Sequence, residues 1–224
     1  MAIALFDLDN TLLDGDSDYE WGQFMATKGM VEREEYEREN ARFYAEYKAG
    51  KLDIYEFAAF SLRPLAACEP EDLYRWREEF MTTHITPIMT RAGQRLIDKH
   101  SGQGDVTIII TATNSFVTSP IAELYGVDHL IATEPEKRND RFTGRIEGEP
   151  CFREGKVARL EQWLTGHSGD LEGSWFYSDS INDLPLLEHV THAVAVDADD
   201  KLARVAAQRR WPHISLRDDT RRAQ

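Results

Sequence analysis

The first apolar stretch of the chain runs directly into a cluster of acidic residues, in the segment ALFDLDNTLLDGD at residues 4–16. Asp7 and Asp9 lie two positions apart, and Asp14 and Asp16 follow closely. Carboxylates this close repel one another unless a cation, a proton or open water compensates their charge. The cluster therefore predicts a metal site, a site of proton transfer or a solvated loop.

Polar side chains also stand at the ends of two later apolar stretches. DVTIIIT ends at Thr111, GSWFYSD ends at Asp179, and Lys156 opens a predicted helix between them. Ligands of open parallel sheets bind beyond the carboxyl ends of the strands, so we expect these three residues to meet Asp7 at one site. Carboxylates, a hydroxyl and an ammonium group suit a phosphate bound together with Mg²⁺, because hard oxygens hold the metal while lysine and hydroxyl bind phosphate oxygens.

The elements that position these residues alternate between strands and helices in the second half of the chain. Strands are predicted at 2–8, 105–111, 173–179 and 192–197, and helices at 119–126, 155–164 and 182–190. This alternation predicts an α/β fold, a parallel sheet doubly wound with helices on both sides. Residues 138–150, RNDRFTGRIEGEP, have the polar, glycine-punctuated character of a hairpin.

A helical insertion is predicted directly after the first strand. Its helices are expected at 32–50, 53–67 and 70–85, the first stopped by Gly50 and the last opened by Pro70. The predicted organisation is an α/β core of residues 1–14 and 90–224 with a helical cap of residues 15–89. We expect the cap to move about hinges near 12–18 and 84–92, so that water can leave the site and return to it.

Composition and charge exclude several classes of partner. The chain has 224 residues and a formal net charge of −14, which argues against nucleic-acid or anionic-membrane binding. No apolar run is long enough to cross a bilayer, and the N-terminus lacks the basic-then-apolar order of a secretory signal. Cys68 and Cys151 match neither a zinc pattern nor a disulfide framework. We therefore expect a cytoplasmic protein with a small-molecule partner.

Four segments together resemble the ordered motifs of the haloacid dehalogenase superfamily. They are DLDNT at 7–11, Thr111 at a strand end, Lys156, and SDSINDLP at 178–185. A helical insertion between the first and second motifs resembles the phosphoserine phosphatase-like branch, whose cap is of type C1. The resemblance covers residues 3 to roughly 215 and implies a Rossmann-like core.

The resemblance implies a role for each motif residue. Asp7 would attack phosphorus and become an aspartyl phosphate, and Asp9 would protonate the leaving alcohol and then activate water. Thr111 and Lys156 would bind the phosphoryl group. The implied Mg²⁺ residues are Asp7, Asp9 through its backbone carbonyl, and Asp179, with Asn182 and Asp183 in support. The acidic residue at position 9 resembles the one found in phosphatases and phosphomutases, whereas dehalogenases have a non-acidic residue there. The type of cap resembles that of phosphatases more than that of mutases, so hydrolysis of a phosphomonoester is favoured.

The cap residues carry the expectation about the substrate. Phosphoserine phosphatases have a glutamate nine residues after the nucleophile that holds the substrate ammonium, and Asp16 takes that position here. Their cap arginine for the substrate carboxylate has its nearest candidate in Arg63. YSDSINDLPLLE also resembles a subgroup that includes bacterial histidinol phosphatases, so we rank histidinol phosphate ahead of phosphoserine. The expected substrate contacts are Asp16, Asp18, Arg63, Thr111 and Asn114.

Other interpretations of these segments stay open at this point. A calcium loop fits poorly, because Leu12 and Asp18 stand where an EF-hand needs glycine and glutamate. A phosphoaccepting module like the response-regulator receivers, or a binding protein that has lost turnover, would use similar residues without hydrolysis. Lys137 is an alternative to Lys156 as the site lysine.

Overall fold

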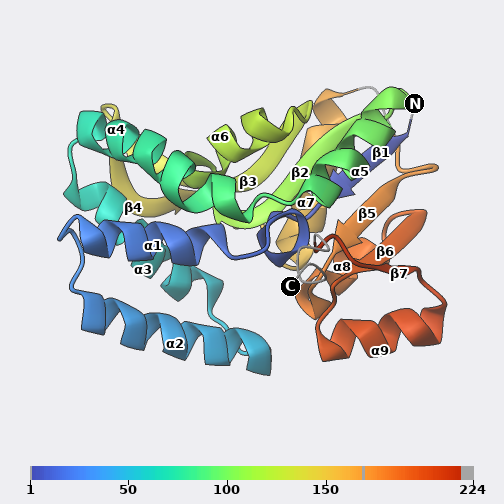
Figure 1. Ribbon diagram of the computed structural model, residues 1–224, viewed down its shortest axis with the longest axis horizontal. Helices are drawn as coiled ribbons and strands as arrows, with labels where there is room; N and C mark the ends of the chain where they lie inside the picture. Colours follow the sequence, from blue (N-terminus) through green and yellow to red (C-terminus); the bar gives the residue numbers. More distant parts are fainter. Residues whose placement is uncertain (1, 168–169, 218–224) are drawn as a thin grey trace, which may run out of the picture.

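A seven-stranded sheet forms the centre of the structure, a computed structural model that describes residues 2–167 and 170–217 (Figure 1). Its order is β4-β3-β2-β1-β5-β6-β7, and every neighbouring pair is parallel except β3 with β4. The strands are β1 (Ile3–Phe6), β2 (Val106–Asn114), β3 (His129–Arg138), β4 (Arg141–Glu147), β5 (Trp175–Ser178), β6 (His192–Val196) and β7 (His213–Ile214). The predicted doubly wound α/β class is confirmed.

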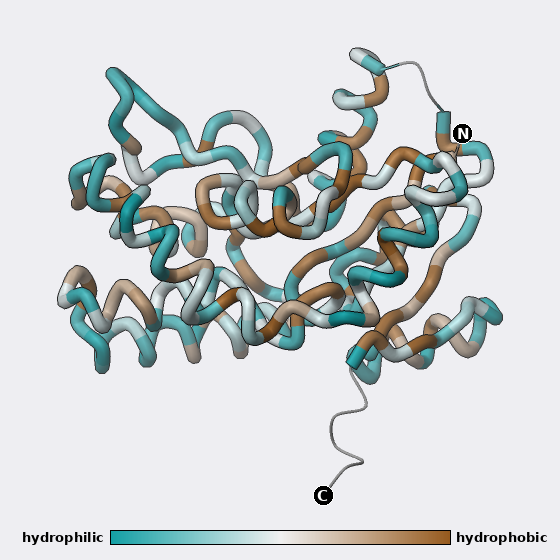
Figure 2. The backbone as a smooth tube through the Cα atoms, turned by 45° about the horizontal axis from the view of Figure 1, so that its top comes forward, coloured by the Kyte–Doolittle hydropathy of each residue, from teal (hydrophilic) through white to brown (hydrophobic). Residues whose placement is uncertain are grey.

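The apolar strands have two buried faces because their side chains alternate. In β1, Ala4 and Phe6 belong to one hydrophobic cluster, and Ile3 and Leu5 belong to the other. Figure 2 shows the apolar stretches concentrated in the interior, where the strands run. Because both faces exclude water, the sheet is a rigid base, and the site lies at the carboxyl ends of its strands.

Helices cover the two faces separately. The first cluster contains side chains from α5 (Arg91–Gly102) and α6 (Ser115–Tyr125). The second contains side chains from α7 (Glu154–Gly166), α8 (Leu184–Leu187) and α9 (Asp200–Arg209). Among the described residues, no helix combines the length and the apolar character that a membrane span requires.

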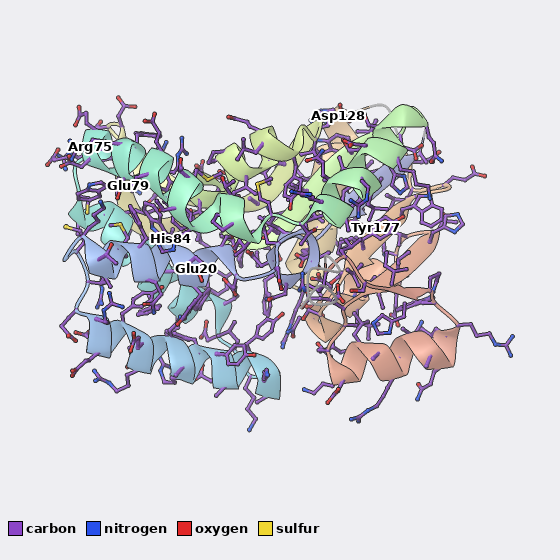
Figure 3. All side chains as sticks on the ribbon, viewed as in Figure 1. Glu20, Arg75, Glu79, His84, Asp128 and Tyr177 are labelled. Atoms are coloured by element: carbon purple, nitrogen blue, oxygen red, sulfur yellow. The ribbon has the colours of Figure 1, made fainter. Side chains whose placement is uncertain are left out.

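The inserted segment forms four helices with side-chain or proline starts. They are α1 (Ser17–Thr27), α2 (Arg33–Ala49), α3 (Ile54–Ala67) and α4 (Pro70–Phe80), followed by a short π-helix, Met81–Ile85, and a short 3-10 helix, Thr86–Ile88. Gly50 ends α2 with a φ of 74°, as its sequence position predicts. His84 lies against Glu20 of α1, with Nδ1 and Oε2 2.8 Å apart (Figure 3).

The segments that join this insertion to the sheet run side by side. Leu13 and Met89 form an antiparallel bridge, and the amide of Asp14 donates to the Ile88 carbonyl at 2.7 Å. The division into a core and a cap, and motion about these segments, stay predictions. Residues 218–224 of the predicted core lie outside the described residues.

The predicted hairpin is larger than the sequence pattern indicated. Its turn is Asn139–Asp140, both with positive φ, and its first strand extends back to His129 as a partner of β2. β4 packs against α3, where a Cβ added to Gly144 would lie 3.3 Å from the Ala66 Cβ. The hairpin therefore extends the sheet under the inserted helices.

One close helix contact predicts a strong effect on stability. A Cβ at Gly22 of α1 would lie 1.7 Å from the hydroxyl oxygen of Tyr36, whose side chain is buried against Phe60. We expect Gly22→Ala to lower the free energy of unfolding by about 1–3 kcal/mol, because overpacking outweighs the gain in helix propensity.

Thermal and urea unfolding of Gly22→Ala would measure this change. The matched control is Gly102→Ala in the last turn of α5, where an added Cβ meets nothing within 4 Å. Equal stability of the two variants would contradict the close packing of α1 on α2.

Candidate active site

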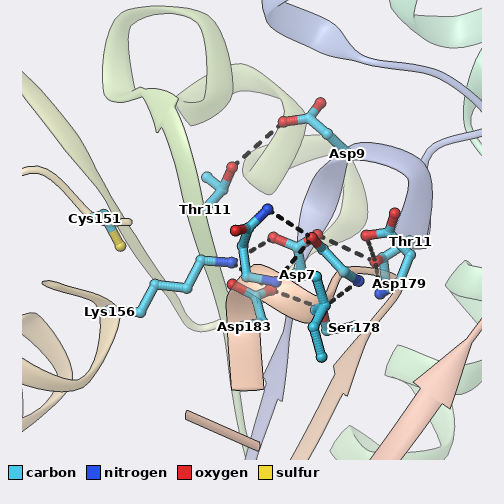
Figure 4. Close-up of polar contacts among 12 residues, drawn as sticks. Asp7, Asp9, Thr11, Thr111, Cys151, Lys156, Ser178, Asp179 and Asp183 are labelled. Atoms are coloured by element: carbon cyan, nitrogen blue, oxygen red, sulfur yellow. Dashed lines mark hydrogen bonds and ion pairs between the residues drawn. The ribbon is translucent and has the colours of Figure 1, made fainter. Parts of the chain in front are cut away.

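Three neighbouring strands bring the predicted site residues to one edge of the sheet (Figure 4). Asp7 directly follows β1, and Asp179 directly follows β5, the strand beside it. Thr111 lies on β2, on the other side of β1, but the strand does not end there as predicted. It continues to Asn114, which pairs with Thr133 of β3 after an irregularity in the register.

Lys156 reaches this edge from the first turn of α7. Its Nζ lies 2.7 Å from Oδ1 of Asp7 and 2.8 Å from Oδ2 of Asp183. Only 3% of the Lys156 side chain is exposed. Ser178 donates a hydrogen bond of 2.7 Å to the same oxygen of Asp183. The lysine therefore links the carboxylate after β1 to the turn after β5.

Thr11 connects the two strand-end carboxylates, a role that its place in the first motif did not reveal. Its Oγ1 lies 3.2 Å from Oδ2 of Asp7 and 3.2 Å from Oδ1 of Asp179, and the Asp179 amide donates to it at 3.1 Å. Because the Thr11 hydroxyl lies within hydrogen-bond distance of both acids, it keeps the Asp7 and Asp179 carboxylates adjacent.

Asp9 is held by the start of the insertion and by β2. The Ser17 amide donates to its Oδ1 at 2.6 Å, and the Thr113 hydroxyl donates to its Oδ2 at 2.8 Å. Thr111 Oγ1 lies 3.5 Å from the same Oδ2. Burial, and then the charge of Asp16, raise the pKa of Asp9 to about 6, although the Ser17 and Thr113 hydrogen bonds oppose the shift. A carboxyl with this pKa can both give and take a proton near neutral pH.

The other buried acids also hold protons more tightly than usual. Burial raises the pKa of Asp7, although the charge and hydrogen bond of Lys156 act against it. Burial and the neighbouring Asp7 and Asp183 raise the pKa of Asp179 well above its ordinary value. Burial disfavours the charge of Lys156, but Asp183 and Asp7 raise its pKa overall. One buried ammonium group thus faces several buried carboxyls.

This donor chemistry fits a bound Mg²⁺. In the part of the chain that the structure describes, no three His, Cys, Asp or Glu side chains form a preformed metal cage. Mg²⁺ is usually held by one or two carboxylates, with waters and substrate phosphate completing its shell. Asp7 and Asp179 supply such a pair, and the excess of buried negative charge around them would be offset by a divalent cation.

Asn182 has a different contact from the one expected of a metal-supporting residue. Its Oδ1 accepts hydrogen bonds from Nε and an Nη of Arg153, at 3.0 and 2.9 Å. Arg153, which precedes α7 with a φ of 52°, was not predicted at the site. The amide oxygen of Asn182 is therefore already engaged, whereas Asp183 contacts Lys156 directly.

A cleft of about 680 Å³ opens above these residues. Aspartates predominate on its polar surface, and aromatic rings from the inserted helices and the α7 approach line the rest. The rings are Tyr19, Phe43, Tyr44, Tyr47, Phe57 and Phe152. The cleft is thus shaped for a small anionic group at its floor and a flat or apolar group against its wall.

The predicted substrate contacts divide into residues on the cleft and residues behind it. Asp16 and Asp18 both line the cleft, although Asp16 also caps α1 by accepting from two backbone amides. Burial raises the pKa of Asp18 well above its ordinary value, and the charges of Asp16 and Asp9 add to the shift. Asn114 caps α6 and lies 3.5 Å from Asp18, so it supports that acid from behind.

Arg63 does not reach the cleft, and the expectation that it faces the substrate is wrong for this structure. Its side chain is 57% exposed and lies 3.6 Å from Glu35. Leu62 and Leu65 of α3 face the hydrophobic core, so the helical period places Arg63 on the solvent side. Lys137 is also outside the cleft, where its Nζ donates to the Tyr74 hydroxyl at 3.1 Å.

At the mouth of the cleft, two hydrogen bonds join α2 to the loop after β5 and to α9. The Tyr47 hydroxyl and Ser180 Oγ lie 2.5 Å apart, and Lys201 of α9 donates to the Lys48 carbonyl at 2.7 Å. Figure 1 shows the end of α2 beside the start of α9. No sequence pattern singled out Tyr47 among the aromatic residues of the insertion as a contact of the site.

Comparisons with known proteins agree on one family. Residues 4–188 match the haloacid dehalogenase-like hydrolases. The chain is 41% identical over 219 residues to a histidinol-phosphatase of Neisseria meningitidis, covering 96% of this chain and 99% of that protein. A crystal structure of a Bordetella pertussis protein of unknown function superposes with a TM-score of 0.90 at 47% identity, covering 96% of this chain and 98% of that one. A substrate-bound phosphoserine phosphatase, at 19% identity and a TM-score of 0.71, covers 98% of this chain and 95% of that one and shares the fold.

Proposed function

The chain belongs to the haloacid dehalogenase-like hydrolases and is a phosphatase of that family, and we propose that it hydrolyses phosphomonoesters with Mg²⁺ through a phosphoryl group on Asp7. The observation that carries this proposal is the placement of Asp7 at the floor of the cleft, between the Lys156 ammonium and the Asp179 carboxyl. A carboxylate in this position can attack phosphorus while the neighbouring positive charges neutralise the phosphate.

The proposed reaction consists of two successive displacements at phosphorus. An Asp7 oxygen attacks phosphorus, the bond from phosphorus to the alcohol oxygen breaks, and Asp9 gives its proton to that oxygen. A water then attacks the phosphorylated Asp7, Asp9 takes the water's proton, and phosphate leaves as the bond to Asp7 breaks. Lys156 and Thr111, which line the same cleft, would bind the phosphoryl oxygens.

Bound Mg²⁺ would be held by Asp7, Asp179 and the Asp9 backbone carbonyl, with Asp183 nearby, and would neutralise charge on the phosphoryl group. Thr11 would keep the two coordinating carboxylates together, since it lies 3.2 Å from each. Ser178 would hold Asp183 toward Lys156 at 2.7 Å.

For the substrate, we propose an amino-bearing alcohol phosphate, with histidinol phosphate ahead of phosphoserine. Asp16 and Asp18 form an acidic wall that a cationic group would compensate. The only arginine among the described lining residues is Arg217, which donates to backbone carbonyls of the chain itself. A substrate carboxylate would therefore lack a free guanidinium partner, whereas a flat ring would meet the aromatic wall. The Neisseria relative, named a histidinol-phosphatase, supports the same order.

Phosphate release from histidinol phosphate, phosphoserine and an aryl phosphate tests this function. We expect turnover of all three, fastest for histidinol phosphate. Preference for phosphoserine would contradict the proposed order of the two substrates, and a stable phosphoprotein without phosphate release would favour the non-hydrolytic phosphoaccepting module.

Removing the metal should abolish most of this turnover. We expect a chelator to lower kcat/KM by roughly 10³-fold, because the metal supplies several kcal/mol of transition-state stabilisation. Restoring Mg²⁺ should restore the rate, and undiminished turnover in chelator would rule out the metal requirement.

Thermal unfolding gives a second readout of the metal. Burial raises the folded-state pKa of Asp183 from 3.8 to about 6. The metal-free fold therefore binds a proton that the unfolded chain releases, and loses stability as the pH rises through this interval. We expect Mg²⁺ to raise the melting temperature at pH 8 and to have little effect at pH 5. The opposite pH order would contradict carboxylate ligands.

A further inference from the structure

The end of the described chain returns to the loop that follows the first strand. β7 pairs with β6 in parallel, and the Leu216 amide then donates to Oδ2 of Asp197 at 2.8 Å. These contacts place Arg217 beside residues 10–14. The active-site loop is therefore contacted by a residue more than two hundred positions away in the sequence.

Arg217 uses three of its nitrogens on this loop. One Nη donates to the Asn10 carbonyl at 2.6 Å, and the other donates to the Leu13 carbonyl at 2.9 Å. Its Nε lies 3.0 Å from Oδ1 of Asp14. The Asp14 side chain is 61% exposed, so this ion pair contributes little, and the two carbonyl contacts are the stronger part of the hold of Arg217 on the loop.

The loop has a backbone that needs such support. Asn10 has a φ of 57° and directly follows Asp9, which itself has non-helical angles. Left-handed backbone is uncommon at residues other than glycine, although asparagine adopts it more readily than most, and surrounding contacts stabilise it. The Asn10 amide donates to the Gly15 carbonyl at 2.8 Å, and Arg217 holds the carbonyl side of the same residue.

We propose that Arg217 is a positioning residue that fixes the Asn10–Asp14 loop and thereby the place of Asp9 above the phosphoryl group. This inference rests on the proposed phosphatase function. It makes the segment after β7 part of the machinery of the reaction, although that segment lies outside all four family motifs. The guanidinium acts on the loop rather than on the substrate, because its contacts are already made within the chain.

Arg217→Ala tests the proposal, with Arg204→Ala as the matched control. Arg204 is an exposed arginine of α9, so its loss changes the net charge equally. We expect Arg217→Ala to lower kcat for histidinol phosphate roughly 10–100-fold with KM within about threefold, because small displacements of a catalytic group have effects of this size. The effect should be smaller for an aryl phosphate, whose leaving group needs less help from the Asp9 proton.

Further readouts separate positioning from simple structural damage. Arg217→Lys should retain part of the rate, and guanidinium ion at non-denaturing concentration should raise kcat of Arg217→Ala but not of Arg204→Ala. Hydrogen exchange of the Asn10 amide should accelerate in Arg217→Ala, while β6 and β7 stay protected by their pairing. A rise in KM alone, or an equal loss on both substrates with a lower melting temperature, would overturn the proposal.

The outcome also distinguishes failure of this inference from failure of the proposed function. If the wild type releases no phosphate from any substrate, the proposed function fails, and the exchange rate of Asn10 still tests the hold of Arg217 on the loop. If the wild type is active and Arg217→Ala behaves like Arg204→Ala in both rate and exchange, only the inference about Arg217 fails.

Discussion

Replacing Asp7 by asparagine is expected to lower phosphate release roughly 10⁴-fold or more, because the proposed nucleophile is lost. Asparagine has nearly the shape of aspartate, so it fills the same buried position beside Lys156 and Thr11. The loss should be equally severe for aryl and alkyl phosphates, since both need the nucleophile. Steady-state phosphate release with each substrate measures it.

Two controls make this result specific. Asp98→Asn, an exposed acid of α5 outside the cleft, should keep the wild-type rate. Mass spectrometry of acid-quenched protein should find a phosphoryl group on the peptide that contains Asp7 in the wild type only. A variant that keeps more than a few per cent of the wild-type rate with unchanged folding would contradict Asp7 as the nucleophile.

Replacing Asp9 by asparagine should have an effect that depends on the leaving group. We expect kcat/KM to fall roughly 10²–10⁴-fold for histidinol phosphate, because the alcohol then leaves without a proton. The first step on an aryl phosphate should fall far less, since a phenolate leaves more readily. Rapid-mixing measurements that separate phenol release from phosphate release would show this, because hydrolysis of the phosphorylated Asp7 still needs the base.

The pH dependence of the wild type follows from the same group. Burial and the Asp16 charge raise the pKa of Asp9 to about 6, so the protonated acid disappears as the pH rises through this value. The first step on histidinol phosphate should therefore slow above about pH 6, whereas the second step should quicken. Equal leaving-group sensitivity in the wild type and Asp9→Asn, or identical pH profiles for alkyl and aryl substrates, would contradict the assignment.

The fold was predictable because its signals are local. Buried strands such as β1 and β2 are short apolar runs, and α2 ends at a glycine. The strand at His129–Arg138 was missed because it contains Pro135 and charged residues and pairs in both orientations. β2 extends beyond Thr111 for a similar reason, since strand pairing continues where apolar character stops.

Site residues were predictable where they belong to ordered motifs and not where they come from distant elements. The structure brings Asp7, Asp9, Thr111, Lys156 and Asp179 together, with Thr11 and Thr113 as additional contacts. The contact of Thr113 with the site could have been predicted, because Thr113 lies two residues after Thr111 on the same strand and therefore on the same face. Tyr47, Arg153 and Arg217 carry no local pattern, and only the folded chain places them there.

The packing of α3 on β4 determines which side of the insertion can separate from the sheet. Beside the hairpin, the inserted helices rest on an extension of the sheet itself, with Gly144 close to Ala66. Beside α9, the contacts across the mouth include the Tyr47–Ser180 and Lys201–Lys48 hydrogen bonds, and the Tyr47 ring lies against Phe152. We therefore expect the entrance to open by movement of α2 away from α9, while α3 stays packed on β4. Passage would then be limited by the thickness of the incoming molecule, so flat phosphate esters should enter readily and branched or polymeric ones should be excluded.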